Sequence, residues 1–101
     1  MRISVSSEGF TLRTGWFPGK RHRWDSVASI SATRADRLTY EALFLIVGLK
    51  GGGSVSLGEF DKGFADFERA LAEAFPGYNA GWRAQAEAGP RGVYVPVWSQ
   101  G

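Results

Sequence analysis

Residues 61–75 carry the strongest helical pattern in the sequence, and this segment constrains the fold more than any other. Its large apolar residues recur at spacings of three and four, with charged residues between them: Phe64, Phe67, Leu71 and Phe75. Burying four such side chains contributes about 6–12 kcal/mol. A domain usually has a net stability of only about 5–15 kcal/mol. The sequence therefore predicts one amphipathic helix over residues 61–75 that completes the core.

The chain has 101 residues, of which 44% are hydrophobic, and this size fits one compact domain. It contains no cysteine, which excludes disulfides and thiolate metal sites. Its first residues include no apolar run of the kind found in signal peptides. The longest apolar run, residues 42–49, is much shorter than the roughly 20 residues of a membrane-spanning helix. We therefore expect a cytoplasmic protein, with a core domain at 1–76 and an extension at 77–101 that packs on the same domain or on a partner.

Alternation of apolar and polar residues predicts several strands before the helix. Residues 2–6 and 10–13 form a hairpin, and residues 21–33 form a strand with a bend or bulge near Asp25 and Ser26. Residues 34–37 are expected to be a polar turn. Residues 38–49 are apolar on both faces in their second half, which favours a central strand, although a buried helix remains open. The glycine-rich segment 50–53 then turns the chain into a strand at 54–57.

The sequence also marks the ends of the helices. Glu59 or Asp61 is expected to cap the start of the main helix, and Pro76 with Gly77 ends it. Asn79 is expected to cap a short second helix that reaches Ala88 and is anchored by Trp82. Residues 89–101 form an extended tail, and Pro96 excludes it from a fully paired central position. The predicted fold class is α+β, mainly β, with about six to seven antiparallel strands.

The inventory of reactive side chains argues against catalysis. His22 is the single histidine, so neither a Cys–His pair nor a multi-histidine metal site can be built within one chain. The carboxylates fall mostly in turns or on the polar face of the helix, where they are solvated. Gly51, Gly52 and Gly53 lead into a strand rather than a helix, unlike a phosphate-binding loop. We therefore expect no enzyme activity, no metal and no cofactor, and an exposed His22.

The segment 9–24 contains no acidic residue but four cations, Arg13, Lys20, Arg21 and Arg23. Trp16, Phe17 and Trp24 lie among them. Such a segment could place aromatic rings at a membrane interface while the cations meet anionic headgroups, or could stack on bases. Alternatively, the rings close one end of the core and the cations are simply solvated. The candidate residues for an anionic ligand are Arg13, Trp16, Lys20, Arg21 and Arg23.

The tail provides a second candidate interaction site because it is apolar and resembles a strand. It could add to a sheet edge of its own domain, of a second copy or of a partner. Its candidate residues are Val93, Tyr94, Val95, Val97 and Trp98.

Three features together resemble the bacterial PH-like domains. They are the turn and strand Glu8-Gly9-Phe10, the spacing of Trp24, Val27 and Ile30, and the closing helix at 61–75. The resemblance covers residues 3–75 and implies a strongly bent, partly open β-barrel of two nearly orthogonal sheets with the helix at one end.

Lipid-binding members of that family carry a basic pattern that Arg13, Arg21 and Arg23 approximate. Two departures weaken the transfer: the first position is arginine, and the cations follow the second strand rather than flanking the first loop. The leading functional hypothesis is a non-catalytic binding module for a protein partner, with self-association as one form. The alternative is weak peripheral binding to anionic lipid headgroups. Nucleic acid is the least favoured partner, because a second basic cluster is missing.

Overall fold

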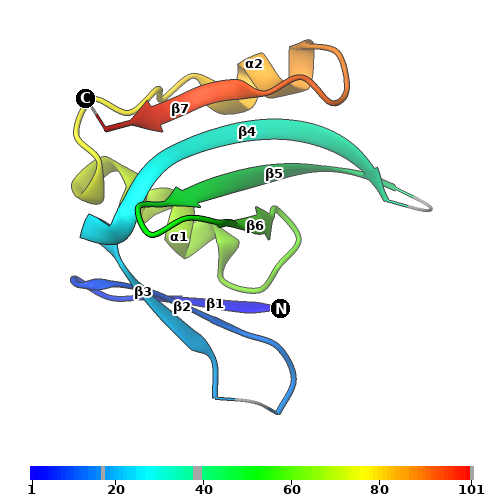
Figure 1. Cartoon of the computed structure of the whole chain (residues 1–101). Coiled ribbons are helices and arrows are strands. Elements are labelled where there is room, and N and C mark those ends of the chain that lie inside the picture. The colour runs from blue at the N-terminus through cyan, green and yellow to red at the C-terminus, as the bar shows by residue number, and fades with distance from the viewer. Residues whose placement is uncertain (17, 38–39, 101) are drawn as a thin grey trace.

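The computed structural model describes residues 1–16, 18–37 and 40–100, and within them seven antiparallel strands form two sheets (Figure 1). The three-stranded sheet, here sheet A, has the order β1-β2-β3, and the four-stranded sheet, sheet B, has the order β6-β5-β4-β7. The predicted mainly β, α+β fold is confirmed. The strands are β1 (Arg2–Val5), β2 (Gly9–Arg13), β3 (Lys20–Arg23), β4 (Val27–Arg37), β5 (Tyr40–Leu49), β6 (Ser54–Gly58) and β7 (Val95–Ser99).

A short 3-10 turn at Trp24–Ser26 carries the chain from β3 in sheet A to β4 in sheet B. The predicted bend near Asp25 and Ser26 is present, and it separates two strands that belong to different sheets. In Figure 1 the long strand β4 then arches over sheet A.

The predicted polar turn at 34–37 is wrong, because β4 continues through Arg37. Its polar residues pair across to β5, where Arg34 lies opposite Leu43 and its guanidinium is 3.4 Å from a carboxylate oxygen of Glu41. Cross-strand pairing thus outweighs the turn propensity of this segment. The rest of the β4–β5 connection, Leu38 and Thr39, lies outside the described residues.

Residues 40–49 form a strand and not a helix, and β5 lies between β4 and β6 in the interior of sheet B. Leu43, Leu45 and Val47 are buried in the core. The predicted hairpin from β5 to β6 is confirmed, with Leu57 of β6 fully buried.

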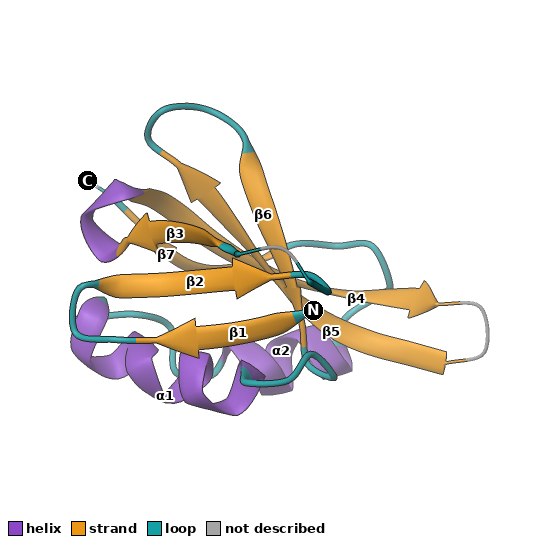
Figure 2. Cartoon of the chain, turned by 90° about the horizontal axis from the view of Figure 1, so that it is seen from below, coloured by secondary structure: helices purple, strands orange, loops and turns teal. Residues whose placement is uncertain are grey.

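The helix α1 (Phe64–Ala74) lies beside β1 and between the two sheets (Figures 1 and 2). The apolar stripe predicted for it is buried as expected, with exposed fractions of at most 3%. The ring of Phe67 meets Phe10 of sheet A edge-on, with 5.2 Å between centroids. Phe75 packs on Trp98 of β7 at 4.6 Å. This one helix therefore joins both sheets to the core.

Helix α1 begins three residues later than predicted, and neither predicted acidic cap is used. The Ile3 backbone N–H donates to the Lys62 carbonyl oxygen at 2.7 Å, which holds residue 62 in line with β1. The cap residue is Gly63, with a φ of 91°. Instead of capping, Asp61 accepts from the backbone N–H of Gly58, and Glu59 accepts from that of Leu43.

The extension packs on its own domain through α2 (Trp82–Ala88) and β7. Trp82 is 2% exposed and Val97 is 3% exposed, so both belong to the core. β7 pairs with β4 as an edge strand, which agrees with the position expected for Pro96. The second helix is confirmed, but its cap is Gly81. Asn79 acts just before it, where its side-chain oxygen accepts from the Gly81 N–H at 3.0 Å.

Candidate functional site

The outer face of sheet A gathers four arginines from its three strands. Alternation along each strand places Ile3, Phe10 and His22 on the buried side and the arginines on the opposite side. The pairing register sets Arg2 directly opposite Arg13, and Arg21 opposite Thr11. The arginines of this face, which we call the cationic face, are Arg2, Arg13, Arg21 and Arg23.

Three of the five residues expected to bind an anion, Arg13, Arg21 and Arg23, lie on the cationic face. Lys20 pairs with Leu12 and so leaves β3 on the other side from Arg21, although it is exposed at the base of the same loop. Trp16 lies in that loop, between β2 and β3, and its side chain is fully exposed. Phe17, its neighbour, lies outside the described residues.

Arg2 was missed by sequence reasoning, although it belongs to the same face. The signal was available in the hairpin of residues 2–6 and 10–13. A turn at Ser7, Glu8 and Gly9 sets the register of the two strands, and that register brings Arg2 opposite Arg13.

Three of the four arginines of the cationic face lack the carboxylate partner that the other described arginines have. Arg23 is paired with Asp25, and the hydrogen bonds from Arg23 lower the pKa of that carboxyl. No carboxylate within the described ranges forms an ion pair with Arg2, Arg13 or Arg21. Outside sheet A, the arginines with described carboxylate partners are Arg34, Arg69, Arg83 and Arg91. Among the arginines whose side chains the structure describes, those without a carboxylate partner therefore all lie on sheet A.

A shallow hollow of about 330 Å³ lies at one end of the cationic face. It is lined by the cations Arg2, Arg13 and Lys62, together with Met1 and Gly15. The neighbouring carboxylate, Asp61, is 3.8 Å from the Met1 ammonium and accepts the Gly58 N–H. We call this feature the basic hollow.

His22 is buried, contrary to the exposed position expected for it. It lies 7% exposed against the ring of Phe10, with 5.2 Å between centroids. Its neighbours in the strand, Arg21 and Arg23, point outward, so alternation along β3 turns the histidine inward. Burial lowers the pKa of His22, and the charge of Lys20 lowers it further.

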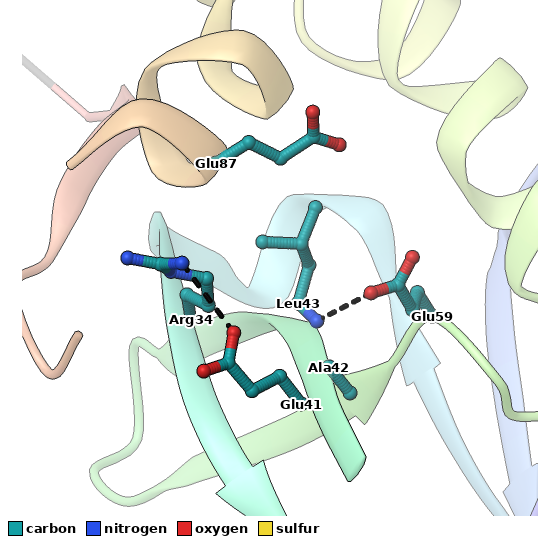
Figure 3. A pocket seen from close by; sticks show the side chains of 6 residues that line it. All are labelled: Arg34, Glu41, Ala42, Leu43, Glu59 and Glu87. Atoms are coloured by element: carbon teal, nitrogen blue, oxygen red, sulfur yellow. Dashed lines mark hydrogen bonds and ion pairs between the residues drawn. The ribbon is translucent and has the colours of Figure 1, made fainter. Parts of the chain in front are cut away.

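A second pocket, of about 250 Å³, contrasts with the basic hollow because its charges are balanced within the protein. In Figure 3, Arg34 points toward Glu41, and Glu59 accepts from the Leu43 N–H. Arg83 of α2 lies 3.3 Å from Glu59 and 4.0 Å from Glu87. These contacts tie α2 to sheet B and indicate a structural role for the carboxylates.

The tail is only partly available for partners. Val97 is buried, Trp98 packs on Phe75, and Val95 is half-buried in β7, whereas Val93 and Tyr94 are exposed before the strand.

Another apolar surface lies on sheet B, where Tyr40 and Phe60 meet edge-on at 5.5 Å. Their side chains are 52% and 68% exposed, and they border a hollow of about 220 Å³ that Ala42 and Phe44 also line. Sequence reasoning did not single out this surface, because Phe60 lies just beyond the strand pattern.

Within the ranges that the structure covers, no helix is long and apolar enough to cross a bilayer. The same residues contain no group of three or more histidine, aspartate and glutamate side chains that could hold a metal ion.

The fold can be placed by comparison with known families. No curated protein and no solved structure shows a significant match to this chain. The model of the bacterial PH domain matches residues 1–74, which include the six strands β1 to β6 and the whole of α1. The match ends before α2 and β7, so these two elements lie outside the matched segment. The chain therefore belongs to the bacterial PH domain family.

Proposed function

We propose that this protein is a non-catalytic module that docks on anionic membrane surfaces through the cationic face and the β2–β3 loop. The observation that carries the proposal is a fully exposed tryptophan, Trp16, on a loop whose base holds the cations Arg13, Lys20 and Arg21. Figure 1 shows this loop projecting beyond the sheets at the end of the molecule farthest from α2.

The arrangement suits a membrane interface for two physical reasons. Tryptophan is favoured at the headgroup level, because its ring is apolar while its N–H can still meet water. Each cation near an anionic leaflet contributes about 1 kcal/mol, which corresponds to about fivefold in affinity. The unpaired charges of Arg13 and Arg21 are available for this attraction, whereas the charge of Arg23 is partly neutralised by Asp25. The resulting contact is weak and sensitive to salt.

Vesicle co-sedimentation at low and high salt tests the proposal. The protein should bind vesicles that contain phosphatidylserine, ignore neutral vesicles and dissociate at high salt. Arg21→Glu should weaken binding by at least about fivefold, and Trp16→Ala by roughly tenfold. Lys50→Glu, which makes the same change in charge beside the 3-10 turn, serves as the control.

Binding that ignores lipid charge, or that survives Arg21→Glu unchanged, would rule the proposal out. Tighter binding to a single-stranded oligonucleotide than to anionic vesicles would instead identify a nucleic acid as the partner.

Self-association through the edge of β6 is a second candidate, which continues the protein-binding hypothesis. Edge strands are usually protected by charge or proline. β1 and β3 carry cations and β7 carries Pro96, but β6 has the sequence Ser54-Val55-Ser56-Leu57-Gly58 with neither protection. The exposed pair Tyr40 and Phe60 lies beside this edge.

Sedimentation velocity tests this second candidate. A dimer should form as the concentration rises and should be lost in Ser56→Pro, which removes a backbone donor from the edge strand. Ser99→Pro in the other edge strand of sheet B is the matched control. A monomer at every concentration, or a dimer that Ser56→Pro leaves intact, would exclude the β6 edge.

A further inference from the structure

We propose that the basic hollow binds a phosphomonoester group, so that the protein prefers membranes whose headgroups end in one. This inference rests on the proposed function, because it specifies which anionic lipid the same end of the molecule selects. The hollow lies next to the membrane-docking loop, since Gly15 lines it and Trp16 follows directly.

The hollow holds charge that the protein does not neutralise. Arg2 and Arg13 lie directly opposite each other in the β1–β2 register. Like charges in that position destabilise a sheet. Lys62 adds a third cation, because its backbone bridges to Arg2. Asp61 is directed to the Met1 ammonium and the Gly58 N–H, and no described carboxylate forms an ion pair with the three cations. A bound anion would relieve this repulsion.

The backbone that carries the three cations is held in place before any ligand arrives. Arg2 and Arg13 belong to paired strands of sheet A. The position of Lys62 is fixed on both sides, since its carbonyl oxygen accepts from the Ile3 N–H at 2.7 Å and its N–H donates to the Met1 carbonyl oxygen at 3.3 Å. Only the side chains must be ordered on binding, which lowers the entropic cost.

The chemistry of the lining favours a phosphomonoester over a phosphodiester. A monoester carries a charge of about −1.5 to −2 at neutral pH and offers three acceptor oxygens. A diester carries a single charge and offers fewer free oxygens. Two guanidinium groups can each donate two hydrogen bonds to a phosphate, and a lysine adds a point charge. The volume of about 330 Å³ lies within the usual range of small ligand pockets, roughly 300–1,000 Å³.

Two measurements on the full chain test this inference. The first compares vesicles that contain phosphatidic acid, whose headgroup is a phosphomonoester, with phosphatidylserine vesicles of equal surface potential. We expect wild-type protein to bind the former about tenfold more tightly. The double variant Arg2→Gln with Lys62→Gln should lose that preference, and its binding to phosphatidylserine should weaken only as much as in a variant that loses equal charge elsewhere. Lys20→Gln with Lys50→Gln removes equal charge from exposed positions outside the hollow and should retain the preference.

The second measurement is calorimetric titration with glycerol 3-phosphate, a soluble phosphomonoester. If the wild type binds glycerol 3-phosphate and Arg2→Gln with Lys62→Gln does not, the result supports the site. If this binding occurs without a preference for phosphatidic acid vesicles, the ligands of the hollow are free phosphate compounds. Equal binding to both vesicles without binding of glycerol 3-phosphate would overturn the inference and leave the proposed function intact. Absence of binding to any anionic vesicle would contradict the proposed function itself. Unfolding midpoints of both double variants verify that these exposed substitutions preserve the fold.

Discussion

His22 couples the stability of the protein to pH, because it is buried against Phe10 and its pKa is lowered. The unfolded chain takes up a proton near the ordinary pKa of 6.5, while the folded protein resists it. The contribution to stability is therefore complete above pH 6.5 and is lost as the pH falls from there toward the lower folded pKa.

Chemical denaturation between about pH 7 and pH 5 measures this effect. Few other groups titrate in this range, because carboxylates titrate mostly below it and His22 is the single histidine. We expect the unfolding free energy of the wild type to decrease across the window and that of His22→Leu to stay nearly level. An equal pH dependence in both proteins would contradict the prediction.

Gly63 is the position where a side chain is least tolerable. Its φ is 91°, and a Cβ atom there would lie 1.9 Å from the carbonyl oxygen of Ile3. The backbone strain costs about 1–3 kcal/mol, and the clash adds to it. Gly52→Ala is the matched control, since Gly52 has a φ of 102° but open space around it. Urea unfolding should show Gly63→Ala to be clearly the less stable variant. Equal losses of unfolding free energy in the two variants would mean that backbone strain alone accounts for both and that the clash with Ile3 is relieved.

At the scale of the elements, Phe67 of α1 tests whether the helix closes the core. Phe67 is 0% exposed and packs on both Phe10 and Trp24. We expect Phe67→Ala to lower the unfolding free energy by about 3–5 kcal/mol. The control is Phe60→Ala, which removes a ring that is 68% exposed and should cost less than about 1 kcal/mol. Similar losses for the two variants would mean that α1 does not close the core.

The elements also explain which features the sequence could predict. The helical period identified α1, the apolar run and the alternation after it identified the β5–β6 hairpin, and Pro96 indicated the edge position of β7. Sequence pattern failed at residues 34–37, where a polar segment stays extended because β5 pairs with it. The cap at Gly63 depends on contact with Ile3, which is 60 residues away in the chain, so the local sequence could not predict it.

Only the part of the candidate site that is local in the sequence could be predicted. Local sequence showed the acid-free segment that contains Arg13 and Arg21, because these residues are close in the chain. The basic hollow also needs Arg2 and Lys62, which only the β1–β2 register and the parallel bridge to β1 bring together.

For the whole molecule, the central question is whether the segment that matches the family can fold without the extension. Trp82 and Val97 are core residues, and Trp98 covers Phe75. Arg83 of α2 also pairs with Glu68 of α1 at 2.8 Å. We expect a chain ending at Pro76 to lose cooperative thermal unfolding and to bind the dye ANS, because it exposes apolar surface. A sharp transition close to that of the full chain would show that residues 1–76 suffice. Trp82→Ala in the full chain should lower the unfolding free energy by about 3–5 kcal/mol. Because this variant keeps the full length, it shows how much of the effect of truncation comes from lost packing.

The described arginines without carboxylate partners all lie on sheet A, although the formal net charge of the chain is only +2. If the protein docks as proposed, the field of an anionic membrane would turn it before contact so that the cationic face and the Trp16 loop approach first. Uneven charge of this kind raises the rate of encounter more than the lifetime of the complex. Added salt should therefore slow arrival at the bilayer more strongly than it hastens departure.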